Sequence, residues 1–241
     1  MKKLLINTLV VVTLISVLNT KTMASPIGNS NMGREYLVNS DPLDHWSIGI
    51  FGGAGKRSIK LESGTKTDLD ITRGMVYVGY DILSWVTPFA ALGVANSDMG
   101  STSSDSSSEF AYGIGVNLKL LNQEIMDPNL MIDVLRINAD IYYNGSQTER
   151  IGNTITWGEI SSSLTIGLIN DTRANKFMFP ESIGIYAGPI YSHYISSDFD
   201  TTDEVGLLAG LDMFFTKRTS FDISIQLFNE TTVNGSLNIR F

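Results

Sequence analysis

The chain has no cysteine and only two histidines, His45 and His193, among its 241 residues. Without cysteine it can form no disulfide framework and offers no thiolate chemistry and no lipid-attachment site in a leader. The sequence also contains no metal-binding cluster, no phosphate-binding loop and no nucleophile elbow. These absences predict a protein without a cofactor.

Basic residues are also scarce, since 17 Lys and Arg face 25 Asp and Glu and the formal net charge is −8. Removing residues 1–24 would take away three lysines and no acid, which leaves −11. An acidic chain without a basic cluster argues against nucleic acid as a partner.

Long apolar runs are missing except at the start, where residues 4–18 follow the basic Met1-Lys2-Lys3. Small residues at Thr22 and Ala24 suit a cleavage site, so residues 1–24 are predicted to be a signal peptide. An uncleaved anchor is the alternative, but the run is short for a bilayer, which needs about 20 apolar residues. Residues 25–45 show little periodicity and are predicted to be a periplasmic leader or, less in keeping with the pattern, a plug.

The sequence is rich instead in segments where apolar and polar residues alternate, which is typical of strands with one apolar face. Residues 110–120 place six large residues on one side and Ala, Gly, Asn and Lys on the other. Ten such segments are found: 46–55, 71–80, 86–94, 110–120, 135–143, 160–168, 183–191, 205–215, 221–227 and 233–241. They predict one all-β domain over residues 46–241.

The final segment alternates without a break and ends on an aromatic residue. Its apolar face consists of Val233, Gly235, Leu237, Ile239 and Phe241. This ending resembles the terminal strand of bacterial outer-membrane β-barrels, a superfamily that includes porins and small OmpA-type barrels. The resemblance implies an antiparallel up-and-down barrel in the bacterial outer membrane. It also implies contacts with the barrel-assembly machinery, periplasmic chaperones, outer-membrane lipids and lipopolysaccharide.

An even strand number suits such a barrel, so ten strands are predicted, with eight as the alternative if one pair is misread. A soluble sandwich or a secreted barrel would also show alternating strands. Tight turns at 81–84 and 216–219 and long polar connections at 95–109, 144–157 and 195–204 fit short periplasmic turns and long outer loops.

Aromatic residues near the expected strand ends suit girdles at the two lipid–water boundaries. Ordinary β-propensity would enrich the same residues. The candidates are Trp46, Tyr80, Trp85, Tyr112, Tyr143, Trp157, Tyr191 and Phe241.

The predicted inner faces carry charges of both signs. These lumen-lining candidates are Lys119, Arg136, Asp140, Glu159, Asp212, Asp222 and Arg240. Charges in a narrow barrel usually pair, because an unpaired buried charge costs several kcal/mol. Bulky side chains are expected there too, and a barrel of this size is only slightly wider than one that side chains fill. The lumen is therefore either a salt-bridged blocked core or a narrow selective pore.

Two loops are candidates for contacts outside the barrel. Residues 101–108 are Ser-rich and predict a surface tip that could carry sugars or touch an extracellular ligand. A second loop groups Asp198, Asp200, Asp203 and Glu204, which offer carboxylate oxygens to a divalent cation but lack a calcium-loop pattern. A solvated acidic tip is the simpler interpretation.

Catalysis has one candidate base, His193, with Asp203 or Glu204 at the start of the next strand. Ten-stranded outer-membrane proteases of the omptin family carry an Asp-x-His dyad, and outer-membrane lipid A deacylases use His-x-Ser. This chain has neither, since Ser196 follows His193 one residue too far along. The sequence thus predicts a non-enzymatic channel or structural and adhesive surface protein, with a hydrolase as the alternative.

Overall fold

The computed structural model describes residues 45–99, 108–127, 132–150, 153–171, 180–216 and 218–241. These residues form ten long strands and one short one, with no helix among them. The long strands are β1 (Trp46–Leu61), β2 (Lys66–Tyr80), β3 (Val86–Met99), β4 (Ser108–Asp127), β5 (Ile132–Arg150), β6 (Asn153–Asp171), β7 (Ser182–Ser196), β9 (Val205–Phe214), β10 (Thr219–Leu227) and β11 (Thr231–Arg240). The short strand is β8 (Phe199–Thr201).

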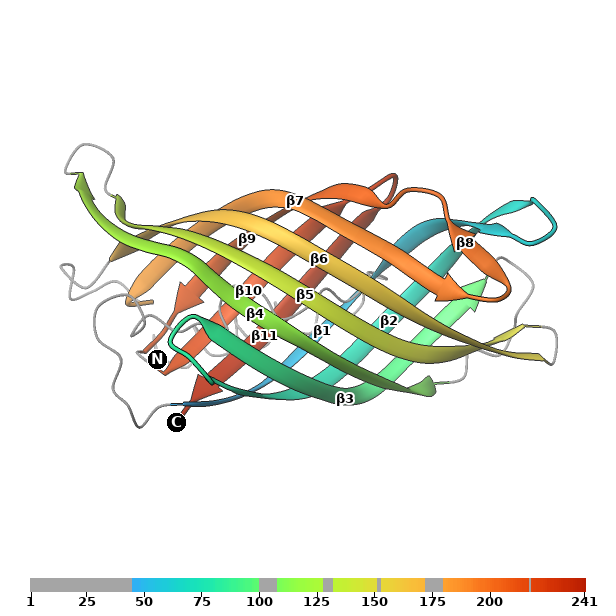
Figure 1. Ribbon diagram of the computed structural model, residues 1–241, viewed down its shortest axis with the longest axis horizontal. Coiled ribbons are helices and arrows are strands. Elements are labelled where there is room, and N and C mark those ends of the chain that lie inside the picture. The colour runs from blue at the N-terminus through green and yellow to red at the C-terminus, as the bar shows by residue number, and fades with distance from the viewer. Residues whose placement is uncertain (1–44, 100–107, 128–131, 151–152, 172–179, 217) are drawn as a thin grey trace, which may run out of the picture.

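The ten long strands close into one barrel, drawn from the side in Figure 1. Each pairs antiparallel with its neighbours along the chain, and β1 pairs with β11 from Ser47↔Arg240 to Gly55↔Thr232. The backbones of Trp46 and Phe241 also bond to each other in both directions, at 3.2 and 3.1 Å. The predicted ten-stranded up-and-down barrel is confirmed, and the eight-strand and sandwich alternatives are wrong.

The two ends of the barrel differ. We term the end with Trp46 and Phe241 the inner end and the opposite end, which carries β8, the outer end (Figure 1). None of the described residues forms a helix long and apolar enough to cross a membrane.

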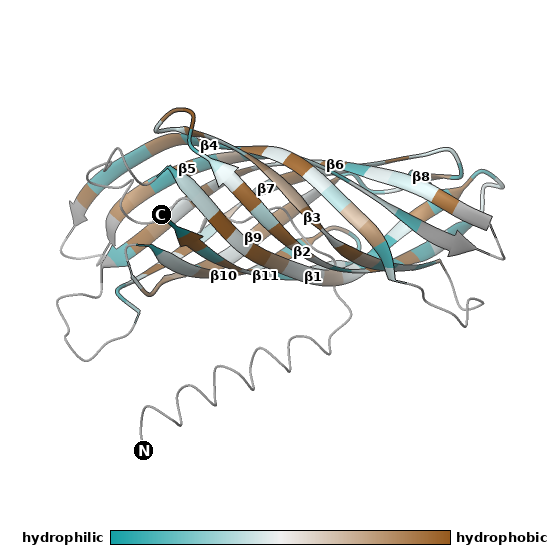
Figure 2. Ribbon diagram, turned by 90° about the horizontal axis from the view of Figure 1, so that it is seen from below, coloured by the Kyte–Doolittle hydropathy of each residue, from teal (hydrophilic) through white to brown (hydrophobic). Residues whose placement is uncertain are grey.

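Side chains alternate between the barrel interior and its outer wall, as the alternating burial along β2 shows. Hydrophobic and hydrophilic residues accordingly follow one another along the strands in Figure 2. Large apolar residues cover the wall on every long strand. We call this set the apolar belt, and it includes Ile48, Ile50, Val76, Val78, Leu92, Val94, Phe110, Ile114, Ile141, Ile160, Leu164, Ile166, Ile185, Val205, Leu207, Ile225, Leu227, Leu237 and Ile239. An exposed apolar surface of this extent requires an apolar surrounding.

Several strands continue past the apolar belt at the outer end, where their polarity is reversed. There the outward side chains are polar, such as Lys56, Lys60, Asp68 and Thr72. The inward side chains are apolar and pack as one cluster. We call this part of the barrel the collar, and its outer cluster consists of Ile59, Leu61, Leu69, Ile71, Met99, Ile155, Trp157, Tyr194 and Phe199. A polar outside and an apolar inside suit a wall that stands in water.

Strand β8 completes the wall of the collar. The turn between β10 and β11, at residues 228–230, lies closer to the inner end than Leu61, the last residue of β1. Strand β1 therefore has no partner on β11 beyond Gly55. The segment 197–204, here called the strap, crosses this gap and pairs β8 with β1 at Ile59↔Thr201 and Leu61↔Phe199.

The connections depart from the expected pattern. The prediction of a long loop at 144–157 is wrong, because β5 and β6 remain paired up to Arg150↔Asn153. The loop at 195–204 contains β8, and β6 ends and β7 begins at the inner end. Inward and outward side chains continue to alternate where the outward residues are polar. The strands therefore extend beyond the apolar belt instead of ending at its edge.

Candidate functional site

The structure places six of the seven lumen-lining candidates among the buried residues, and Lys119 is half-buried. All lie on the inward side of their strands. The charges gather in groups that come from different strands, and each group has its own hydrogen-bond partners.

Three carboxylates meet deep in the barrel. Asp212 on β9 and Asp222 on β10 face each other directly in the register, and the Tyr186 hydroxyl donates to Asp222 at 2.6 Å. Asp140 on β5 accepts from Ser163 at 3.1 Å and from Asn117. The guanidinium of Arg136 brings positive charge close to Asp212.

A second group lies toward the outer end. Glu159 on β6 accepts from Ser192 at 2.7 Å and from Asn144 at 2.9 Å. Its Oε2 also lies 3.6 Å from Nη2 of Arg73 on β2. Arg73 was not among the sequence candidates, although its position in the alternating segment 71–80 points its side chain inward.

A third group lies near the inner end. Arg240 forms an ion pair with Asp81, which also accepts from Thr87 at 2.5 Å. Both partners of the ion pair are buried, so the interior carries paired charges as the blocked-core interpretation requires.

Apolar and aromatic side chains fill the levels between these charges. Tyr142, which is 1% exposed, stacks on Phe89 at a ring distance of 5.6 Å in a cluster with Phe51 and Tyr77. Val134, Ile169 and Phe214 form a further cluster. Interior side chains this buried leave little lumen surface to water.

Comparisons with known proteins do not identify a family for this chain. No family model matches the chain, and no curated protein matches its sequence.

Among solved structures, an outer membrane channel from Pseudomonas putida F1 shares 11% identity over 89% of this chain and 100% of its own, with a TM-score of 0.42. The outer membrane protease OmpT from Escherichia coli shares 11% over 83% of this chain and 98% of its own, with a TM-score of 0.36. The translocator domain of the autotransporter NalP from Neisseria meningitidis shares 9% over 85% and 90%, with a TM-score of 0.35. These neighbours differ in activity, and at such scores none lends its function to this chain.

The candidate dyad is on the outer wall. His193 Nδ1 lies 2.7 Å from Glu204 Oε1, and both side chains are more than one-third exposed. Tyr191 also hydrogen-bonds to Glu204. Across the strand pair, His193 faces Ile160 of the apolar belt. Asp203 does not join the dyad, since its carboxylate accepts from Asn229.

The four acids of the strap do not converge. Asp198 accepts from Ser197 at 2.8 Å, and Asp200 accepts from the Thr201 amide at 2.8 Å. Asp203 and Glu204 have the separate partners given above. Among the described residues, no group of three potential ligands could hold a metal ion.

The remaining sequence candidates divide into three sets. The prediction that Trp157 belongs to an aromatic girdle is wrong, because its side chain faces the interior and is 2% exposed. The residues 233, 235, 237, 239 and 241 of the terminal strand lie on the outward face, where Leu237, Ile239 and Phe241 are exposed and Val233 is half-buried. The signal peptide, the leader up to residue 44 and most of the Ser-rich stretch 101–108 lie outside the described residues.

Proposed function

We propose that this protein is an integral bacterial outer-membrane barrel whose lumen is closed at rest and which acts at its outer face. The apolar belt supports the membrane location, because such barrels carry an apolar outward band around a polar interior. The observation that carries the closed state is the filled interior, where Asn117 is 0% and Arg136 is 2% exposed.

Of the two earlier alternatives for the lumen, the paired charges favour the blocked core. Arg240–Asp81 and Arg73–Glu159 each join a cation to an acid inside the barrel. A water-filled pore would leave such groups hydrated and separately exposed. The role as a structural or adhesive surface protein therefore has more support than the role as a passive channel.

Single-channel recording of the refolded protein in a planar bilayer tests this proposal. We expect insertion without reproducible current steps. Steps whose ion selectivity shifts in Asp140→Asn, Asp212→Asn or Asp222→Asn would instead establish a pore lined by these acids. A heat-modifiable band on a detergent gel verifies that the silent protein is folded.

A surface hydrolase is the second candidate, supported by the 2.7 Å contact between His193 and Glu204. A carboxylate that orients a histidine is an arrangement suited to general-base catalysis. Its place beside the apolar belt would direct it toward lipid headgroups or proteins at the membrane surface.

The hydrolase candidate is tested by incubating the protein with casein or with lipid A and following products by mass spectrometry. Hydrolysis that disappears in His193→Ala and persists in His45→Ala would support it. Equal amounts of product from the parent and both variants, or no product from any of them, would rule out the hydrolase.

A further inference from the structure

The floor of the outer cluster contains a cation whose hydrogen bonds are incomplete. The Arg73 side chain is 1% exposed and has one ion pair, with Glu159 at 3.6 Å. It also contacts the Tyr142 hydroxyl. Its Nε and Nη1 have no hydrogen-bond partner. Buried donors without acceptors are costly, so the site is chemically unfinished.

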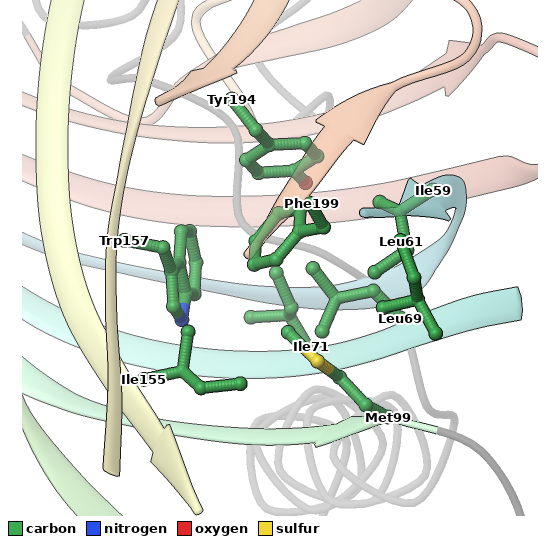
Figure 3. Packing of buried hydrophobic residues seen from close by; sticks show 9 residues of the cluster. All are labelled: Ile59, Leu61, Leu69, Ile71, Met99, Ile155, Trp157, Tyr194 and Phe199. Carbon is green, nitrogen blue, oxygen red and sulfur yellow. The ribbon is translucent and has the colours of Figure 1, made fainter. Parts of the chain in front are cut away.

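Trp157 adds a second unused donor in the same place. Its indole Nε1 is buried without a partner, and the Arg73 guanidinium lies 5.6 Å from the centre of its ring. Figure 3 shows Trp157 among the apolar side chains of the outer cluster. Two sets of free donors therefore border the apolar outer cluster, a combination that suits a ligand with an acidic head and an apolar chain.

The strap contributes one side chain, Phe199, to the outer cluster. Phe199 on β8 points into the outer cluster, 5.9 Å from the Tyr194 ring, which in turn lies 5.5 Å from Trp157 (Figure 3). Only three residues of β8 pair with β1, so the strap is held far less extensively than any long strand. Movement of β8 away from β1 would withdraw Phe199 and open the side of the collar.

We propose that the collar is a binding compartment for an anionic amphiphile. Arg73 and Trp157 receive its carboxylate, phosphate or sulfate group, the outer cluster surrounds its chain, and the strap opens to admit it. This site goes beyond the closed barrel proposed above and stands even if the deeper lumen conducts ions.

The experiment uses Trp157 as its own reporter in a Trp46→Phe/Trp85→Phe background, since the chain has three tryptophans. The protein is placed in phosphatidylcholine nanodiscs, and 2-bromododecanoate, whose bromine is next to the head group, or the neutral 2-bromododecanol is added. We expect saturable quenching by the acid and at least about tenfold weaker binding of the alcohol, because the alcohol cannot form the charge-assisted hydrogen bond. No saturable quenching by the acid would overturn the site.

Two variant sets make the test specific. Arg73→Gln/Glu159→Gln removes both charges together, so no lone charge is buried, and it should weaken acid binding about tenfold. Arg73→Lys should restore part of it. If the double variant binds the acid as well as the parent does, Arg73 is not the receptor for the head group.

The strap is tested by Lys60→Cys/Asp200→Cys, two outward positions that face each other between β1 and β8. The parent chain has no cysteine, so this pair forms the only disulfide. Oxidation should abolish quenching and reduction should restore it. Equal quenching in both states would show that the ligand does not pass the strap.

A last arm separates the two sources of such a ligand. Phosphatidylglycerol with brominated chains is built into the nanodisc in place of the free acid. Quenching of Trp157 by this lipid identifies the bilayer as the source. Quenching by added acid alone identifies a free amphiphile, and quenching by neither refutes the proposal.

Discussion

At the level of single residues, several interior aromatic rings lie directly over glycines of the neighbouring strand. A Cβ on Gly210 would lie 2.4 Å from the Tyr186 ring, and one on Gly115 would lie 2.4 Å from Phe89. Covering a glycine with an aromatic ring stabilises designed sheets as well. These interior glycines are thus the places where large rings fit, and they do not leave the lumen open.

Gly210→Ala should therefore destabilise the barrel. The added methyl group displaces Tyr186, whose hydroxyl bonds to Asp222, and overpacking of this kind costs about 1–3 kcal/mol. Urea unfolding of the refolded protein measures the change. Gly74→Ala is the matched control, because a Cβ there meets nothing within 4 Å. Equal stability of the two variants would contradict the packing.

The ion pair between Arg240 and Asp81 gives a second residue-level prediction. Arg240→Gln or Asp81→Asn alone removes the opposite charge from a buried ion and should cost about 3–5 kcal/mol. The double variant removes both charges and should recover much of that loss. Thermal unfolding of the parent, the two single variants and the double variant gives a double-mutant cycle. If the double variant loses at least as much stability as the two single variants together, the ion pair is refuted.

At the level of elements, the strap depends on Arg57. Its Nη2 donates to the Asp203 carbonyl at 2.6 Å, and its guanidinium lies 3.5 Å from the centre of the Phe228 ring. Thr202 adds a hydrogen bond to the Ser58 carbonyl at 2.5 Å. One buried side chain thus ties the strap to β1 and to the tip between β10 and β11.

Arg57→Met should loosen the strap while leaving the long strands paired. We expect proteinase K to cleave within residues 197–204 at least several times faster, with the fragments identified by mass spectrometry. Lys56→Met is the control, since Lys56 is the exposed neighbour that points outward. A variant as resistant as the control would show that the strap does not depend on Arg57.

The strands could be predicted from the sequence more fully than their ends could. Alternation assigned the inward side of Asp140, Asp212 and Asp222 because one face of each strand is apolar. It could not reveal the collar, where apolar residues such as Ile59 and Trp157 point inward and the rule of the belt is reversed. Pairing of Phe199 with Leu61 links distant residues that no local pattern connects.

At the level of the whole molecule, the proposed position in the membrane makes the three tryptophans unequal. Trp46 and Trp85 are each 48% exposed on the wall, whereas Trp157 is inside. In bilayers of brominated phosphatidylcholine, single-tryptophan variants that keep Trp46 or Trp85 should be strongly quenched, and the variant that keeps Trp157 should not. Strong quenching of Trp157 by this neutral lipid would place the collar within the bilayer.

The seam between β1 and β11 also bears on the order in which the barrel folds. All other neighbouring long strands follow one another along the chain, but the seam joins Gly52 to Gly235. Closing a long loop costs more conformational entropy than closing a hairpin, and distant contacts form slowly. The hairpins therefore assemble first, and the sheet curls until its two edges meet in the slowest step. A fluorescent pair across the seam should accordingly report later than a pair across β10 and β11, and simultaneous signals would mean concerted closure.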